Sequence, residues 1–403
     1  MIDQPEFKEI LFAPHPVGRL TAPNRFVAQP MEINAAGPGG EVSPDIEQRY
    51  LTLARGGWGI IVVEALSVTE TSLARRNQLV MTEENVPRLQ SLVAGMKQIA
   101  PETLIFLQVS HAGVISNPDF SRCVSVWPPA THRAGDPRVE MVADEEIAEI
   151  EDQYVRAFLL AEQSGADGID FKACHGYLVA EFLRPANLRS GPYGGDLGNR
   201  LRFFQEVVEK YKQVRTRADF CFGTRFSFFE GVPGGFGSIG PDSVEEYFVE
   251  PLAFVTLCRE IGLDFVNVTA GIPAVTPEVT RPTVKTLQNM DKHFEYQRAT
   301  KDAAGEMAVI GSGYSAARLD LPEVAAQNLR DGVTDFVGLG RQNLAEPLYP
   351  QKFRDGGPAL CTCTLCGGCS DLLKAQEMVG CVAYDRVAMK RARDLRRAEK
   401  QLN

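Results

Sequence analysis

Five of the nine cysteines in this chain of 403 residues lie in one short stretch near its C-terminus, 361-CTCTLCGGCSDLLKAQEMVGC-381. Four of them follow the pattern Cys363-x2-Cys366-x2-Cys369-x11-Cys381. Three thiolates at this spacing can surround one face of a [4Fe–4S] cluster, and a fourth from a following turn can complete it. A Zn(Cys)4 site is the competing interpretation, but it more often has two C-x-x-C pairs separated by a longer loop. The spacing therefore favours iron–sulfur over zinc.

Cys361 is an extra thiol beside this pattern. The spacing leaves open whether it replaces Cys363 as a ligand. A group of unligated thiols is the least favoured interpretation, because such thiols oxidise readily. The other four cysteines are scattered along the chain, and we expect them to be buried small hydrophobic residues: Cys123, Cys174, Cys221 and Cys258.

A second group of candidate functional residues follows short apolar runs that are rich in β-branched residues. Eight such runs span residues 25–30, 59–65, 104–110, 167–172, 221–227, 264–269, 307–312 and 335–340, with helical patterns such as 143–166 and 200–215 between them. Nearly continuous apolar runs are typical of parallel strands that are covered on both faces, and eight strand–helix units predict a (β/α)8 TIM barrel with insertions. A doubly wound sheet is less favoured, since no G-x-G-x-x-G follows the first run.

In such a barrel the active site lies at the carboxyl ends of the strands. Two of the five histidines in the chain, His111 and His175, fall there, as does Arg225. The loops after the last two runs read 311-GSGYSAARL-319 and 338-GLGRQNLAEP-347, and their glycines would let the backbone approach a phosphate group. On spacing alone, plain chain turns explain these glycines equally well.

The composition is that of an ordinary globular protein, with 44% hydrophobic and 23% charged residues. A formal net charge of −10 argues against a general nucleic-acid-binding protein. The sequence has no apolar run long enough to span a membrane, and its acidic N-terminal stretch is unlike a signal peptide. We therefore expect a cytoplasmic protein that binds neither nucleic acid nor membrane.

Several stretches resemble the old yellow enzyme family of FMN-dependent oxidoreductases. The most specific stretch is 175-HGYLVAEFLRPANLRSGPYGGDLGNRLRF-203, and the others are 24-NRFVAQPM-31, 107-LQVSHAG-113, 223-GTRFS-227 and 340-GR-341. The resemblance covers nearly the whole chain. Because of its cysteine segment, the chain is similar to the members that carry FMN and a [4Fe–4S] cluster, 2,4-dienoyl-CoA reductase and trimethylamine dehydrogenase. This implies an FMN-binding TIM barrel over residues 1–355, followed by an iron–sulfur segment and a terminal helix over 356–403.

The resemblance implies which residues hold the cofactors. Pro30, Met31 and Ala65 would line the flavin, and Gln108 would hydrogen-bond its pyrimidine edge. Arg225 would lie near N1 and O2 of the flavin, where a cation stabilises the reduced anion. The residues implied to bind the FMN phosphate are Ser312, Gly313, Gly340 and Arg341, and those implied to ligate the cluster are Cys363, Cys366, Cys369 and Cys381.

The resemblance also implies catalytic roles. His175 falls at one of two positions that hold the substrate's carbonyl oxygen, and Tyr177 matches a tyrosine that protonates the substrate carbon opposite the hydride. The other carbonyl-binding position is usually histidine but here is Lys172, a point charge that would suit an enolate or a carboxylate-bearing substrate. Glu32 stands where relatives commonly have Cys, Thr or His, so FMN is expected to be held non-covalently. We interpret Glu32 as a partner of Lys172 or as a group that tunes the flavin.

The sequence thus predicts an NAD(P)H-dependent ene-reductase that transfers hydride from reduced FMN to the C=C bond of an α,β-unsaturated carbonyl, enoate or enoyl compound. Two alternatives stay open: an amine or C–N oxidoreductase like trimethylamine dehydrogenase, and a non-catalytic electron-transfer subunit. The basic stretch 384–403 is predicted to be a solvated helix, with docking of an electron-transfer protein or a second subunit as the alternative. A homo-oligomer is expected.

Overall fold

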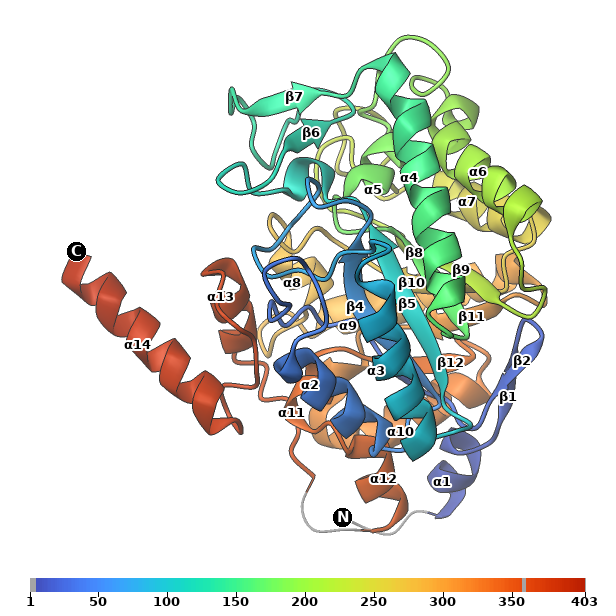
Figure 1. The fold of residues 1–403 in the computed structure, drawn as a ribbon. Coiled ribbons are helices and arrows are strands. Elements are labelled where there is room, and N and C mark those ends of the chain that lie inside the picture. The colour runs from blue at the N-terminus through green and yellow to red at the C-terminus, as the bar shows by residue number, and fades with distance from the viewer. Residues whose placement is uncertain (1–4, 357–359, 403) are drawn as a thin grey trace.

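The computed structural model describes residues 5–356 and 360–402, in which the chain forms a closed barrel of eight parallel strands (Figure 1). The strands neighbour one another in chain order: β3 Phe26–Ala28, β4 Ile60–Ser67, β5 Leu104–Ser110, β8 Gly168–Ala173, β9 Cys221–Ser227, β10 Phe265–Thr269, β11 Ala308–Gly311 and β12 Phe336–Leu339. Each of them overlaps one of the eight runs expected from the sequence. The predicted (β/α)8 fold is therefore confirmed.

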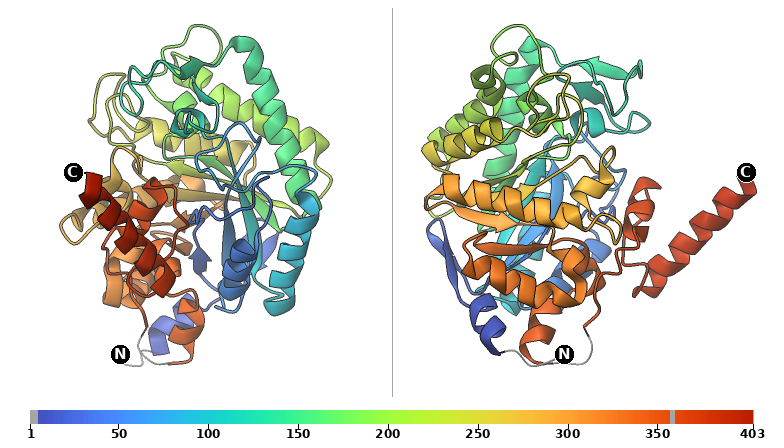
Figure 2. Two further views of the ribbon diagram at one scale, coloured as in Figure 1. Left: turned by 60° about the vertical axis from the view of Figure 1, so that its left-hand side comes forward. Right: turned by 180° about the vertical axis from the view of Figure 1, so that it is seen from behind.

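Helices follow the barrel strands and cover the outside of the barrel (Figures 1 and 2). They are α2 Pro44–Ala54, α3 Val86–Ile99, α4 Asp144–Gln163, α6 Leu197–Val214, α7 Val249–Glu260, α9 Gln288–Ala304, α10 Leu321–Arg330, α11 Arg341–Ala345 and α12 Tyr349–Arg354. The expected helices 143–166 and 200–215 correspond to α4 and α6. Tyr154 of α4 and Phe204 of α6 both pack their rings on Phe171 of β8, with centroids 4.8 and 4.9 Å away. No helix within residues 5–356 and 360–402 has the length and apolar character needed to span a bilayer.

The amino-terminal half of the barrel interior is filled with apolar side chains. Phe106 of β5 and Phe265 of β10 stack across it, with ring centroids 5.0 Å apart. A hairpin of β1 His15–Val17 and β2 Leu20–Ala22 packs Val17 and Ala22 into the same cluster, and helix α1 Pro5–Leu11 precedes it. Because this end is closed, the space for a ligand lies at the carboxyl ends of the strands.

Loop insertions surround that end of the barrel. They contain η1 Gly113–Ile115, β6 Cys123–Ser125, β7 Val139–Met141, α5 Leu178–Leu183, α8 Pro277–Thr280 and η2 Tyr314–Asp320. The cysteine-rich segment adds α13 Gly368–Lys374, and the basic stretch forms α14 Arg386–Leu402, which projects away from the barrel (Figures 1 and 2). Residue 403 and the residues just after the expected domain boundary, 357–359, lie outside the described residues. The division at 355/356 stays a prediction.

Gly223 of β9 is a sensitive position in the barrel interior. A Cβ atom there would overlap the ring of Phe265. We expect Gly223→Ala to lower the free energy of unfolding by about 1–3 kcal/mol, because the packed interior cannot absorb an added methyl group. Gly198 in α6 is the matched control, since a Cβ atom there meets nothing within 4 Å. Gly198→Ala should leave stability unchanged or raise it slightly, and equal effects in urea unfolding of the two variants would contradict this account.

Candidate active site

A cavity of about 370 Å³ opens at the carboxyl ends of the barrel strands. Twelve of the residues predicted to bind the flavin or to act in catalysis line it: Pro30, Met31, Glu32, Gln108, Lys172, His175, Tyr177, Arg225, Ser312, Gly313, Gly340 and Arg341. Ala65 is not among the described residues that line the cavity. It is buried in β4, and its carbonyl oxygen accepts a hydrogen bond from Gln78.

A buried polar network reaches the cavity through Gln29, Gln108 and Arg225, which line it. Gln29, just after β3, exchanges two hydrogen bonds of 2.9 Å with Asn267 of β10. Asn267 also donates to Asp170 of β8 at 3.3 Å, and Gln108 donates to the same carboxylate oxygen at 3.1 Å. Arg225 donates to the side-chain oxygen of Gln29. Sequence reasoning missed Asn267 and Asp170 because they lie inside apolar runs, where nothing local separates a functional polar residue from a structural one.

The loops after β11 and β12 form the part of the cavity expected to take a phosphate group. Gly313 has a φ of 92°, in the left-handed region that favours glycine, and a Cβ atom there would lie 3.0 Å from His293. His293 accepts a hydrogen bond from the Ser312 hydroxyl at Nδ1 (3.0 Å) and donates one from Nε2 to a backbone carbonyl of α8 (2.9 Å). Burial lowers the pKa of His293 to about 4, so its imidazole is neutral and can keep both roles. His293 lies within α9, and no sequence signal marked it.

Glu32 lies at the centre of a charged group on the cavity wall. Its Oε1 atom accepts a hydrogen bond from the Tyr177 hydroxyl at 2.8 Å and lies 3.2 Å from Lys172 Nζ. Its Oε2 atom lies 3.2 Å from Arg75 Nε. Burial disfavours the charged carboxylate, but Lys172 and Arg75 outweigh it and lower the pKa of Glu32 to about 2. The expected pairing of Glu32 with Lys172 is therefore present, whereas Arg75 was not foreseen.

Tyr177 and Lys172 also contact each other directly. The Lys172 ammonium lies 3.4 Å from the centroid of the Tyr177 ring. Burial and the Glu32 carboxylate raise the pKa of Tyr177 to about 12, so the phenol is protonated at neutral pH. Burial disfavours the ammonium form of Lys172, but Tyr177 and Glu32 raise its pKa above the usual value. The cavity therefore presents a phenol with its proton and a charged ammonium side by side.

His175 adopts a backbone φ of 62°, which turns the chain sharply after β8. Its backbone N–H donates to Ser227 Oγ at 3.0 Å, and its Nε2 atom lies 3.1 Å from the hydroxyl of Thr269. Burial lowers the pKa of His175 well below its usual range, and Arg225 and Lys172 add to the effect. The imidazole is therefore a neutral, directional hydrogen-bonding group.

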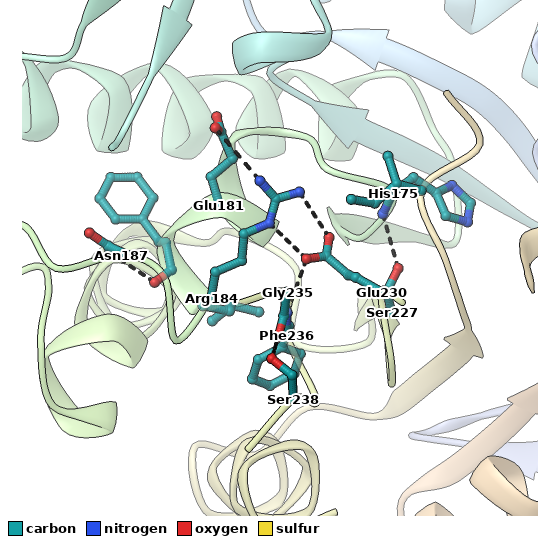
Figure 3. A network of polar contacts seen from close by, with 12 residues as sticks. His175, Glu181, Arg184, Asn187, Ser227, Glu230, Gly235, Phe236 and Ser238 are labelled. Atoms are coloured by element: carbon teal, nitrogen blue, oxygen red, sulfur yellow. Dashed lines mark hydrogen bonds and ion pairs between the residues drawn. The ribbon is translucent and has the colours of Figure 1, made fainter. Parts of the chain in front are cut away.

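A buried ion network holds the turn that carries these residues (Figure 3). Arg184 donates to both carboxylate oxygens of Glu230, at 2.7 and 3.2 Å, and lies 3.9 Å from Glu181. A Cβ atom on Gly176, between His175 and Tyr177, would lie 3.0 Å from the Arg184 guanidinium. Glu181 in turn accepts hydrogen bonds from two residues of the chain between β5 and α4, Val114 and Ser125. The network therefore connects the loops after β5, β8 and β9 beside the catalytic candidates.

Of the four predicted cluster ligands, one lies in the cavity wall and the others belong to the same segment. Cys369 lines the cavity, together with the neighbouring Ser370. Burial raises the pKa values of Cys363, Cys369 and Cys381, and each of these thiols lies close enough to another cysteine to raise its pKa further. Within residues 5–356 and 360–402, no group of three or more ligand side chains is arranged to hold a metal ion. The iron–sulfur cluster therefore stays a prediction that rests on the spacing of the cysteines and on the family resemblance.

The sequence signature of the NADH:flavin oxidoreductase / NADH oxidase family matches residues 10–359. The chain belongs to this family. The resemblance to the old yellow enzyme family is thereby confirmed, and the family indicates FMN and NAD(P)H as its cofactors.

Two relatives show how far the similarity extends. The chain is 27% identical over 385 residues to the metal reductase of Desulforamulus reducens, which covers 93% of this chain and 53% of that protein. It is 28% identical over 420 residues to the cinnamate reductase of Clostridium sporogenes, which covers 97% of this chain and 60% of that protein. The chain therefore spans between half and two thirds of the length of these relatives.

Solved structures share the fold. The 2-naphthoyl-CoA reductase in complex with 2-naphthoyl-CoA superposes with a TM-score of 0.78 at 22% identity, over 94% of this chain and 58% of that one. Histamine dehydrogenase from Rhizobium sp. 4-9 superposes with a TM-score of 0.76 at 22% identity, over 93% and 52% of the two chains. At these identities the likeness concerns the fold alone.

Two observations in the cavity fit a bound FMN. The Nε atom of Arg225 and Oδ1 of Asp170 are buried, and neither has a hydrogen-bond partner in the described part of the chain. A buried guanidinium nitrogen without a partner is costly unless a ligand satisfies it. Gly313 and Gly340 leave space that a side chain would fill, since a Cβ atom on Gly340 would lie 3.2 Å from Met31 Sδ. The family's cofactor therefore matches the residues present.

Glu181 makes stability depend on pH. Burial raises its pKa to about 7, above the unfolded value of about 4.3, so the folded state holds a proton that the unfolded chain releases. The Glu181 carboxyl group therefore contributes fully to the free energy of unfolding below about pH 4.3. This contribution is lost as pH rises through about 7, at up to about 1.4 kcal/mol per pH unit. We expect Glu181→Gln to unfold with a flatter pH dependence between pH 5 and 7. Glu149→Gln, an exposed change on α4, is the control, and an unchanged slope in the Glu181 variant would contradict this assignment.

Proposed function

We propose that this protein is an FMN- and [4Fe–4S]-dependent ene-reductase that reduces the C=C bond of an α,β-unsaturated carbonyl compound with electrons from NAD(P)H. The observation that carries the proposal is that Tyr177, Lys172 and His175 line one cavity, with the Lys172 ammonium 3.4 Å from the centroid of the Tyr177 ring. A protonated phenol, an ammonium and a neutral imidazole supply the acid and the oxyanion donors that this reaction needs. The cinnamate reductase relative supports reduction as the direction of the chemistry.

The residues that would hold FMN come from five strand ends. Arg225, with its free Nε atom, would face the pyrimidine part of the flavin together with Gln108, and Pro30 and Met31 would flank the ring. Arg341 would face the phosphate group, along with Ser312, whose hydroxyl is already oriented by His293. Non-covalent binding is proposed because no thiol stands at position 32.

Bound FMN would supply hydride to the β-carbon of the substrate, and negative charge would then build on the carbonyl oxygen. Lys172 would donate to that oxygen with an ammonium hydrogen that Glu32 does not use, and His175 would be the second donor. Donors fixed in advance in this way typically contribute about 3 kcal/mol each to the transition state. Tyr177 would then transfer its phenolic proton to the α-carbon, and the adjacent Lys172 ammonium would stabilise the phenolate that remains.

The iron–sulfur cluster would be held by Cys363, Cys366, Cys369 and Cys381, and it would supply one-electron transfer at the edge of the cavity. The placement of Cys369 in the cavity wall supports this part of the proposal. A separate electron-transfer protein is the alternative donor to NAD(P)H. A homo-oligomeric assembly and a cytoplasmic location belong to the same proposal. A zinc site is the alternative for these thiols.

An amine oxidoreductase is the second candidate, favoured by the shared fold of histamine dehydrogenase. The charges of the cavity weigh against it. The described side chains that line the cavity include one carboxylate, Glu32, and seven cations: Arg75, Arg133, Lys172, Arg225, Arg281, Arg341 and Lys374. A protonated amine would enter against this excess of positive charge, so we rank this function second.

The role of Tyr177 is tested by Tyr177→Phe in protein reduced anaerobically by NADH or NADPH and then mixed with enones, enoates and enoyl thioesters. We expect flavin reduction to be unchanged and reoxidation by the substrate to slow by about 10²-fold or more, because the general acid is lost. Tyr193→Phe is a matched control, since this phenol also donates to a carboxylate at 2.8 Å, that of Glu206, outside the cavity lining. Equal rates in the two variants would reject the role of Tyr177, and reduced flavin that no organic substrate reoxidises would favour an electron carrier.

The cluster ligands are tested by metal analysis of anaerobically purified protein. We expect about four irons per chain, most of them lost in Cys366→Ala while FMN is retained, because FMN is held by the barrel. Cys361→Ala should keep its iron if Cys361 is not a ligand. Zinc in place of iron, or full iron in Cys366→Ala, would overturn this part of the proposal.

A further inference from the structure

The carboxylate of Glu32 is bound as proteins bind a carboxylate ligand. An ammonium (Lys172), a phenol (Tyr177) and a guanidinium (Arg75) converge on its two oxygens at 2.8 to 3.2 Å. Charge-assisted contacts of this kind are the strong ones in anion recognition. Lys172 and Tyr177 donate hydrogen bonds to Oε1, whereas Arg75 forms an ion pair with Oε2 without a hydrogen bond from its Nε atom. The three side chains form a carboxylate-binding position, and a side chain of the protein itself occupies it.

This position lies inside the substrate cavity. All four side chains line it, and the exposed fractions of Glu32 and Lys172 are only 11% and 5%. In the proposed reaction, two of these residues, Lys172 and Tyr177, also act on the acyl group of the substrate. Of the seven cations that line the cavity, Lys172 and Arg75 are already paired with Glu32. A substrate carboxylate at this position would therefore lie beside the Glu32 carboxylate in a site with little water, where like charges repel strongly.

Glu32 is held firmly in this place. The next residue, Ile33, donates its backbone N–H to the buried carboxyl group of Glu64 behind the cavity wall. Lys172 and Arg75 lower the pKa of Glu32 to about 2, so its carboxylate is ionised at neutral pH. The negative charge is therefore a permanent feature of the pocket.

We propose that Glu32 is an internal anion that occupies the carboxylate-binding position of the pocket, and that it selects substrates whose double bond is activated by a neutral acyl group. Ketones, esters, amides and thioesters fit this class, and free enoates do not. The inference rests on the proposed function, since it assumes that the acyl group binds beside Lys172 and Tyr177. It assigns Glu32 to substrate selection rather than to proton transfer.

The test is ligand binding to the oxidised FMN-loaded protein, measured by calorimetry with cinnamate and cinnamamide, which have the same carbon skeleton and differ in charge. Wild-type protein should bind cinnamamide more tightly than cinnamate. Glu32→Gln keeps the side-chain length and removes the charge, so the affinity for cinnamate should rise about tenfold or more while that for cinnamamide changes little. A second change, Arg75→Gln in the Glu32→Gln background, should remove most of this gain, because Arg75 is then the free cation.

Several results would overturn the inference. One is that the wild-type protein binds cinnamate more tightly than cinnamamide. The others are that Glu32→Gln raises the affinity for cinnamate by less than about fivefold, or that it raises the affinity for both ligands equally. Glu32→Ala removes the same charge and replaces the glutamine variant if that variant does not retain FMN. Binding to the oxidised protein needs no turnover, so failure of the ene-reductase proposal is recognised separately, as reduced flavin that no unsaturated compound reoxidises.

Discussion

All eight strands of the barrel are parallel, and this constraint determines the rest of the structure. Their carboxyl ends must meet at one mouth, so the loops that follow them place their side chains around a single cavity. The amino end is filled by stacked rings such as Phe106 and Phe265, which leaves no room for a ligand there. Residues that are hundreds of positions apart, such as Gln29 and Asn267, become hydrogen-bond partners for this reason.

Because the loops converge at one mouth, charged side chains are brought together in a place with little water, which is unfavourable. Ion pairs compensate these charges. Glu32 is shared by Lys172 and Arg75, and Glu230 is bound by both arms of the Arg184 guanidinium. A buried charge without such a partner is strongly disfavoured. The same pairs hold the turn of His175 and Tyr177 in position, so charge compensation and the orientation of the catalytic candidates have one physical origin.

The cysteine segment uses the mouth of the barrel in a different way. It follows the last barrel strand and returns along the rim, where Cys369 and Ser370 become part of the cavity wall. Ser370 accepts a hydrogen bond of 2.5 Å from Arg281, in the loop after β10. The segment is thus attached to the barrel by a side-chain hydrogen bond in which none of the four predicted ligand thiols takes part.

The sequence by itself determined the barrel and the location of the site. Apolar runs and helical patterns are local features that predict the strand ends, and the family resemblance then identified twelve cavity-lining residues there. Only the tertiary structure decided which residues interact. The partnership of Glu32 with Arg75, the support of Ser312 by His293 and the burial of Asp170 beside Asn267 depend on how strands and loops meet in space, and no short stretch of sequence encodes such contacts. Ala65 illustrates the same limit, since it was expected at the end of its strand but β4 continues to Ser67, and the carbonyl oxygen of Ala65 accepts a hydrogen bond from Gln78.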